Sequence, residues 1–169
     1  AGAAVGLSLG MNLVEIAEAM KDYQIPEGRT KFMPGINNTW ILDDAYNASP
    51  DSVLASLDLI ESAPVKRRIV ALGDMKELGN LSEQAHQLIG LAIAEKNIDV
   101  FIGVGEEMIK ARESALKKNP KIQTFWFKNS EQARETIKEI LQKGDLILIK
   151  GSRAMQMEKI TQEINLENN

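Results

Sequence analysis

Cysteine is absent from the 169 residues, and histidine occurs only once, as His86. The chain can therefore form neither disulfide bonds nor thiolate metal sites, and one histidine alone cannot build a zinc site. The lack of cysteine is consistent with the reducing environment of the cytoplasm. We therefore expect a cytoplasmic protein without a metal site of its own in this chain.

Basic charge and long apolar runs are also scarce. The 20 Lys and Arg residues are outnumbered by 24 Asp and Glu residues, which gives a net charge of −4. A chain without a basic surface has little to hold a nucleic-acid backbone or an anionic membrane. No apolar run approaches the ~20 residues that a membrane-spanning helix needs. We therefore expect neither nucleic acid nor a membrane among the partners.

What the sequence does contain is an alternation of strand-like and helix-like segments. Residues 31–37 should form an antiparallel edge strand. This segment runs into Asn37-Asn38, a pair that tolerates the positive φ of a tight turn. Two helices should come before this strand. The sequence thus predicts an α/β fold with a Rossmann-like, doubly wound, mainly parallel sheet. The other strands are expected near residues 40–45, 68–72, 99–103, 123–127 and 145–149.

The segment from Ile41 to Ser52 should turn a buried strand into a capped helix. Its apolar start gives way abruptly to the polar cluster Asp43 to Asn47. Ser49 can accept hydrogen bonds from the first free helical N–H groups, and Pro50 suits the first helical position. Asp51 complements the helix dipole. We therefore expect a helix that begins at Pro50, with the polar cluster at its entrance.

Other helix starts follow from the same capping rules. Asn12 with Glu15, and Asn80 with Glu83, have the spacing of capping boxes. Ser130 is placed to be the N-cap of a later helix.

Two more polar clusters follow predicted strands directly. They run from Gly73 to Lys76 and from Lys150 to Arg153. Gly151 allows a backbone to approach closely, while the cations beside it suit a carboxylate or a phosphate. Because ligands of doubly wound sheets bind at the carboxyl ends of the strands, we expect all three clusters to share one crevice.

Two other interpretations of these strand ends bear on the kind of ligand. The Gly103-Val-Gly105 turn lacks the third glycine of a dinucleotide fingerprint, since Met108 stands in its place. Paired acids after one strand and a lysine after a later one also suit a non-catalytic, receiver-type binding module. Such a module remains an alternative on the residues alone.

The three clusters together resemble the carboxy-terminal domain of the Mur ligase family. The residues that carry the resemblance run from Asp43 to Ser52, from Leu72 to Gly79 and from Lys150 to Lys159, with a Gly28-Arg29 pair before them. The form matches the member that adds D-alanyl-D-alanine. Other Mur ligases and folylpolyglutamate synthase share the architecture and the Gly-Arg pair, and remain alternatives.

The resemblance implies an ATP-dependent ligase of peptidoglycan precursor synthesis. Its substrates would be UDP-N-acetylmuramoyl-tripeptide and D-alanyl-D-alanine, joined through an acyl phosphate. It also implies that residues 1–24 are the last helices of a truncated central ATP-binding domain, 25–30 an interdomain linker and 31–169 the carboxy-terminal domain. No Gly-x-x-x-x-Gly-Lys-Ser/Thr loop occurs in the sequence, so the central domain would hold most of the ATP and the Mg²⁺, and this chain alone should be inactive.

The site residues follow from the same match. Arg29, Asp44 and Tyr46 are the expected contacts to ATP. From the residues alone, Arg29 is an ordinary surface arginine, Lys76 is a solvated side chain and His86 is solvated or hydrogen-bonded. The candidates for the peptide substrates and the acyl phosphate are Asn47, Asp74, Lys76, His86, Lys150, Ser152 and Arg153.

Overall fold

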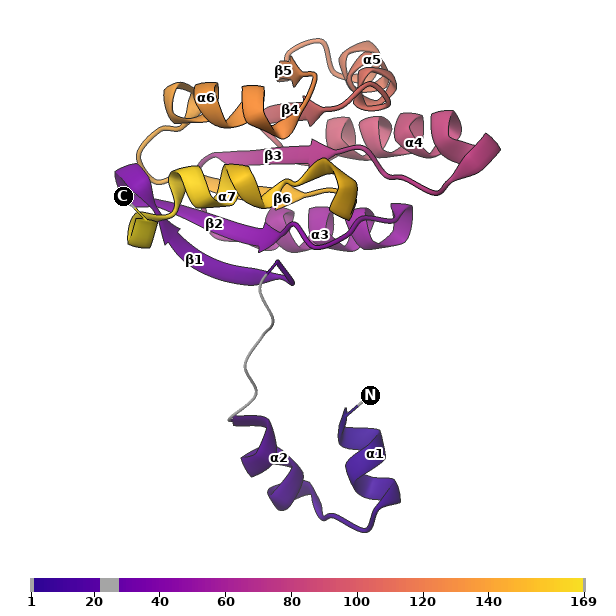
Figure 1. Ribbon diagram of the computed structural model, residues 1–169, viewed down its shortest axis with the longest axis vertical. Helices are drawn as coiled ribbons and strands as arrows, with labels where there is room; N and C mark the ends of the chain where they lie inside the picture. The colour runs from indigo at the N-terminus through magenta and orange to yellow at the C-terminus, as the bar shows by residue number, and fades with distance from the viewer. Residues whose placement is uncertain (1, 22–27, 169) are drawn as a thin grey trace.

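The computed structural model describes residues 2–21 and 28–168, and the second range forms a mixed sheet with helices on both faces (Figure 1). The strands lie in the order β1-β2-β6-β3-β4-β5. β1 and β2 pair antiparallel, and every other neighbouring pair is parallel, as predicted. The strands are β1 Lys31–Gly35, β2 Thr39–Asp44, β3 Arg68–Gly73, β4 Val100–Val104, β5 Gln123–Phe127 and β6 Leu146–Lys150.

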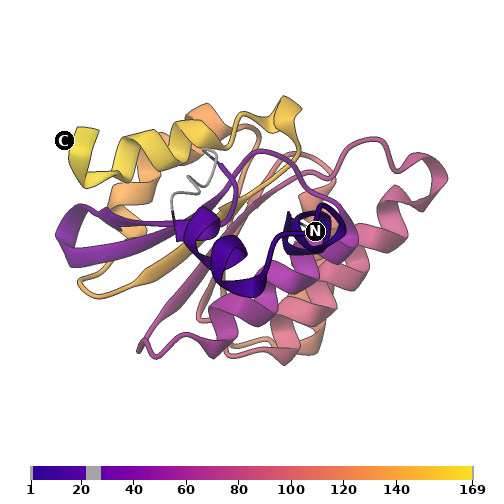
Figure 2. The ribbon, with the colours of Figure 1, turned by 90° about the horizontal axis from the view of Figure 1, so that it is seen from below.

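The helices divide between the two faces of the sheet (Figure 2). One face is covered by α3 (Pro50–Ser62), α4 (Ser82–Glu95) and α5 (Met108–Lys118), and the other by α6 (Ser130–Ile140) and α7 (Glu158–Ile164). Each face has its own apolar cluster. The doubly wound fold class is therefore confirmed.

The central strands are buried on both faces, which explains why they appear in the sequence as unbroken apolar runs. Every residue of β4 and of β6 is buried. Along β6, Leu146 and Leu148 belong to the cluster under α3 to α5, while Ile147 and Ile149 belong to the cluster under α6 and α7. At about 1.5–3 kcal/mol for each buried aliphatic side chain, this strand contributes strongly to the core.

The insertion of β6 between β2 and β3 creates the switch point of the sheet. Lys150, the last residue of β6, pairs in register with Asp44 of β2 on one side and Leu72 of β3 on the other. The three polar segments that follow β2, β3 and β6 therefore leave the sheet side by side at the carboxyl ends of these strands, where doubly wound proteins bind ligands.

The turn into β2 and the start of α3 form as predicted. Asn37 and Asn38 have φ values of 55° and 57°. The Ser49 side chain accepts a hydrogen bond from Ser52 N, and Pro50 is the first helical residue.

Two other predicted caps are wrong. Asn80 lies inside a 3-10 turn, Gly79–Leu81, whose backbone leads into α4 without the extended residue that a side-chain cap needs. For α6, Asn129 is the extended residue, and its side chain accepts from Gln132 N at 3.0 Å, so the cap falls one residue before Ser130.

The amino-terminal segment forms the helices α1 (Gly2–Ser8) and α2 (Leu13–Lys21). The predicted Asn12 and Glu15 capping box is present. Of the apolar stripe on α2, Ile16 is buried against α1, whereas Leu13 and Met20 are 70% and 60% exposed. The expected linker, 25–30, lies partly outside the described residues, and no helix in the described ranges is long and apolar enough to cross a membrane.

Candidate functional site

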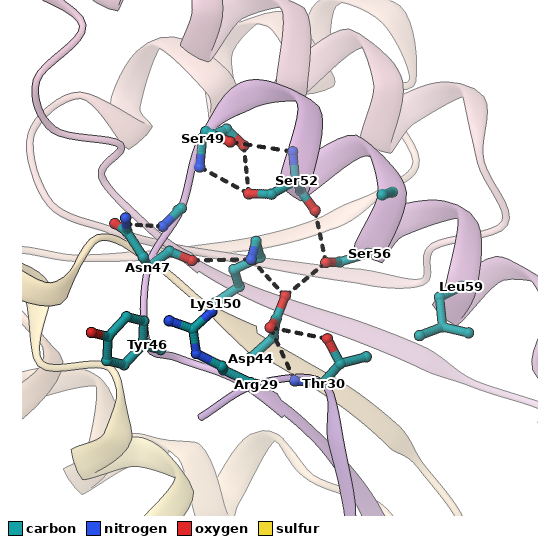
Figure 3. A pocket seen from close by; sticks show the side chains of 12 residues that line it. Arg29, Thr30, Asp44, Tyr46, Asn47, Ser49, Ser52, Ser56, Leu59 and Lys150 are labelled. Carbon is teal, nitrogen blue, oxygen red and sulfur yellow. Dashed lines mark hydrogen bonds and ion pairs between the residues drawn. The ribbon is translucent and has the colours of Figure 1, made fainter. Parts of the chain in front are cut away.

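A pocket of about 500 Å³ lies where β2 and β6 end and α3 begins (Figure 3). Its walls come from the segment before β1, from the β2–α3 junction and from the end of β6. The sheet order brings these distant parts of the sequence together. The pocket is lined by Arg29, Thr30, Asp44, Tyr46, Asn47, Ala48, Ser49, Ser52, Ala55, Ser56, Leu59 and Lys150.

Asp44 is the centre of the hydrogen bonds in this pocket. Its Oδ1 accepts from the N–H of Thr30 at 3.0 Å and from the Thr30 hydroxyl at 3.2 Å. Its Oδ2 lies 2.9 Å from Ser56 Oγ and 2.5 Å from Lys150 Nζ. A carboxylate has about four acceptor positions, so Asp44 is fully engaged within the protein.

Lys150 is a buried cation, and Asp44 is its counter-ion. The two side chains are only 4% and 13% exposed. Lys150 Nζ also donates to the backbone oxygen of Asn47 at 3.0 Å. Because a charge is costly to bury without a partner, the pair ties the ends of β6 and β2 to the loop that enters α3.

Arg29 and Tyr46 form an exposed pair at the same pocket. The guanidinium carbon of Arg29 lies 4.1 Å from the centre of the Tyr46 ring, a cation–π distance. The backbone beneath them is joined by a hydrogen bond from Tyr46 N to Gly28 O, at 2.9 Å. The pair presents a flat cationic and aromatic surface that suits a base or another planar group.

Asp43 points to the opposite face of the sheet from Asp44, because side chains alternate along a strand. Its Oδ1 accepts from Ala45 N and from the Thr161 hydroxyl of α7, and its Oδ2 accepts from Gly28 N at 3.1 Å. Burial raises the pKa of the Asp43 carboxyl above its ordinary value, although these hydrogen bonds oppose the shift.

Asp74, Lys76 and Ser152 form a second polar cluster at the same edge of the sheet. Asp74 Oδ1 accepts from the N–H of Met108 at the start of α5, at 3.1 Å, and its Oδ2 accepts from Lys76 Nζ at 2.8 Å. Ser152 Oγ in turn accepts from Lys76 N. A side chain at Gly105 would place its Cβ 2.4 Å from the Asp74 carboxylate, so this glycine makes room for the cluster.

His86 holds the loop that carries this cluster. Its side chain is completely buried and hydrogen-bonded, so the interpretation as a solvated side chain is wrong. Its Nε2 accepts from Met75 N at 3.0 Å, and its Nδ1 lies 2.7 Å from the backbone oxygen of Ser82, which can only accept. These partners require a neutral ring with the proton on Nδ1. His86 therefore fixes the loop that carries Asp74 and Lys76.

Arg153 belongs to a separate hollow of about 600 Å³ between β1 and α7. Its side chain is 66% exposed and pairs with Glu158 at 3.2 Å. The other carboxylate oxygen of Glu158 is buried without a hydrogen-bond partner. Tyr46 lines both this hollow and the Asp44 pocket, so the two are neighbours.

The structure thus gathers Arg29, Asp44, Tyr46, Asn47 and Lys150 around one pocket. The expectation of a single crevice for all candidates is wrong, because the side chains after β6 diverge. Lys150 points into the Asp44 pocket, Ser152 into the Asp74 cluster and Arg153 into the second hollow. Asp74, Lys76 and His86 accordingly lie outside the pocket.

The sequence reasoning missed two hydrogen-bond partners of Asp44. Ser56 lies one helical turn after Ser52, so helix periodicity could have placed it beside Asp44. Thr30 has no comparable signal, because its position depends on how the chain enters β1. In the parts of the chain that the structure describes, no group of three His, Cys, Asp or Glu side chains could hold a metal ion. These residues do not fit a bound Mg²⁺.

Comparison with known proteins gives this geometry a context. The family described as "Mur ligase, glutamate ligase domain" matches residues 28–153. A UDP-N-acetylmuramoyl-tripeptide–D-alanyl-D-alanine ligase from Bacillus subtilis is 32% identical over 165 residues, which are 97% of this chain and 36% of the relative. The same enzyme from Escherichia coli is 29% identical over 97% of the chain and 35% of the relative. The chain therefore spans about a third of the length of these curated relatives.

Solved structures agree. MurF from Acinetobacter baumannii superposes with a TM-score of 0.78 at 28% identity, over 92% of this chain and 34% of that one. MurF from Thermotoga maritima, solved in complex with ADP, gives a TM-score of 0.72 at 25% identity, over 95% of this chain and 35% of that one. The family match decides against the receiver-type alternative. Fold, motifs and comparisons converge on one conclusion, which is that this chain belongs to the Mur ligase family and carries its carboxy-terminal domain.

Proposed function

We propose that this domain is part of an ATP-dependent ligase that joins D-alanyl-D-alanine to UDP-N-acetylmuramoyl-tripeptide through an acyl phosphate. The support is the relatives of that name, which match nearly the whole chain at 27–32% identity. Structures of folylpolyglutamate synthase and of other Mur ligases resemble the chain at only 12–15% identity, a likeness of fold.

Within this function, the Asp44 pocket takes up the adenine nucleotide. The observation that carries the proposal is the Arg29–Tyr46 pair at the edge of a pocket with a carboxylate inside it. The flat pair can stack on a base or pair with a phosphate, and Asp44 can accept from ribose hydroxyls. Since Asp44 is already fully engaged, a ribose hydroxyl would replace the Thr30 hydroxyl, whose 3.2 Å hydrogen bond is the longest of the four.

The residues proposed for the peptide substrates divide by exposure. Asn47, Lys76 and Arg153 have accessible side chains and can contact a dipeptide carboxylate or an acyl phosphate. Lys150, Asp74, His86 and Ser152 are buried and would act by holding the loops in place.

Phosphoryl transfer also needs a phosphate loop and Mg²⁺. The sequence contains no such loop, and the described residues do not fit the metal, so both would come from another part of a longer ligase. We expect this chain by itself to release no phosphate above a no-protein blank when given ATP, Mg²⁺ and both peptide substrates.

The nucleotide proposal is tested in a ligase polypeptide that contains this domain together with a phosphate loop. Arg29→Ala removes a charged contact worth about 1.5–3 kcal/mol, so the KM for ATP should rise roughly 10- to 150-fold. The KM for D-alanyl-D-alanine should stay the same. Arg134→Ala, which removes a partly exposed arginine of α6, is the matched control. An unchanged KM for ATP in Arg29→Ala would place the nucleotide elsewhere.

A further inference from the structure

The consecutive residues Asp43 and Asp44 accept hydrogen bonds from the backbone on either side of Arg29, from opposite faces of the sheet. Asp43 accepts from Gly28 N at 3.1 Å, and Asp44 accepts from Thr30 N at 3.0 Å. The residues before and after Arg29 are therefore each held by a carboxylate. Arg29 itself is left with an exposed side chain between two fixed neighbours.

Gly28, which donates its N–H to Asp43, is also hydrogen-bonded to the backbone of Tyr46. Gly28 O accepts from Tyr46 N, and an added Cβ at Gly28 would lie 3.0 Å from that same nitrogen. Gly28 has a φ of +69°, which favours glycine. The backbones that carry Arg29 and Tyr46 thus touch at the point where Asp43 binds.

We propose that Asp43 is a positioning residue, whose hydrogen bond to Gly28 N fixes the backbone of Arg29 so that the guanidinium stays over the Tyr46 ring. Arginine loses much rotamer freedom when it stacks, and a fixed backbone limits that loss to the side chain itself. Asp43 faces α7, away from the Asp44 pocket, so it acts through Arg29. The consequence for ATP rests on the proposed function, whereas the hold on Arg29 does not.

The Asp43→Asn substitution separates the hold on Gly28 from the rest of the carboxylate's contacts. Asparagine has one accepting oxygen and one NH₂ group. The oxygen is best placed where Oδ1 now accepts from two donors, Ala45 N and the Thr161 hydroxyl. The NH₂ group then faces Gly28 N–H, donor against donor, and this hydrogen bond is lost.

Nuclear magnetic resonance of the chain, without nucleotide, reads the hold directly. In Asp43→Asn, amide exchange of Gly28 should speed up at least about 10-fold, the factor for the loss of about 1.4 kcal/mol. The upfield ring-current shift of the Arg29 side-chain protons over Tyr46 should shrink. Thr161→Val is the control, because it removes a donor from the same carboxylate but leaves the bond to Gly28. It should change neither signal.

The outcomes are distinct. Unchanged Gly28 exchange and Arg29 shifts in Asp43→Asn, or the same changes in Thr161→Val, would overturn the proposal. Asp43→Ala, which removes every acceptor, must repeat the Asp43→Asn result if both fold. In the longer ligase, Asp43→Asn should raise the KM for ATP and leave the KM for D-alanyl-D-alanine unchanged. If the ring-current shift of the Arg29 protons is lost but the KM for ATP is unchanged, Asp43 does position Arg29, and the proposed role of the pocket in nucleotide binding is refuted.

Discussion

The buried pair of Lys150 and Asp44 should respond unequally to the loss of each partner. Asp44→Asn leaves the Lys150 ammonium, whose side chain is 4% exposed, with neutral oxygen acceptors only and without its counter-ion. Removing one partner of a buried pair costs about 3–5 kcal/mol. Lys150→Met leaves the Asp44 carboxylate with its contacts to Thr30 and Ser56, so we expect a smaller loss of about 1–3 kcal/mol.

Urea denaturation of the wild type, both single variants and the double variant measures these losses and their coupling. The double variant should cost little more than Lys150→Met, because it leaves no unpaired buried charge. The coupling should therefore approach the loss in Asp44→Asn alone, about 3–5 kcal/mol. Asp44→Asn should lower the Tm by roughly 6–20 °C, from about 2–4 °C for each kcal/mol in a domain of this size. Added salt should leave the coupling intact, since buried pairs are poorly screened. Losses below about 0.5 kcal/mol in both single variants, the level of an exposed pair, would refute the reasoning.

Three further predictions concern the residues around the pocket. His86→Ala leaves Met75 N–H without its acceptor and should cost at least about 1–3 kcal/mol in urea denaturation, with faster amide exchange at Met75; wild-type exchange there would contradict the buried hydrogen bond. Gly105→Ala should displace the Asp74 carboxylate and also strain a φ of +108°, so its Tm should fall, whereas alanine at the open Gly2 should leave the Tm unchanged. Burial raises the pKa of Asp43, so the folded chain keeps a proton that the unfolded chain releases, and the stability from this group is fullest below pH 3.8 and declines as the pH rises through the folded pKa. The unfolding free energy of the wild type relative to Asp43→Asn, measured by denaturation at several pH values, should therefore fall across that window, and a constant difference would show that Asp43 is not desolvated.

The sequence predicts those features of the fold that depend on local patterns. Apolar runs gave the strands, and Asn37-Asn38 gave the turn into β2, because their signals lie within a few residues. The predicted start of α6 was displaced by one residue, since Asn129 and Ser130 are both competent caps and only the backbone conformation decides between them.

The side-chain partners in the site were less predictable than its place. Asp44 and Lys150 lie at the same end of the sheet because β2 and β6 are parallel. Their ion pair also requires that β6 lie beside β2, and the sequence does not reveal this strand order. His86 could not be recognised as buried from its helix alone, because Met75, the partner of its Nε2, comes from the loop after β3 and only Ser82 belongs to the same helix. Such contacts arise from tertiary packing, which overrides local preference.

The central position of β6 has a consequence for how the protein is made. β2 and β3 do not pair with each other, because β6 lies between them. β6 is synthesised much later than either strand, and Lys150 follows Asp44 by 106 positions. Until β6 emerges, both strands keep open edges that can bind other chains. Contacts over such distances in sequence also form slowly. The Asp44 pocket, which Lys150 lines, therefore stays incomplete until β6 has joined the sheet.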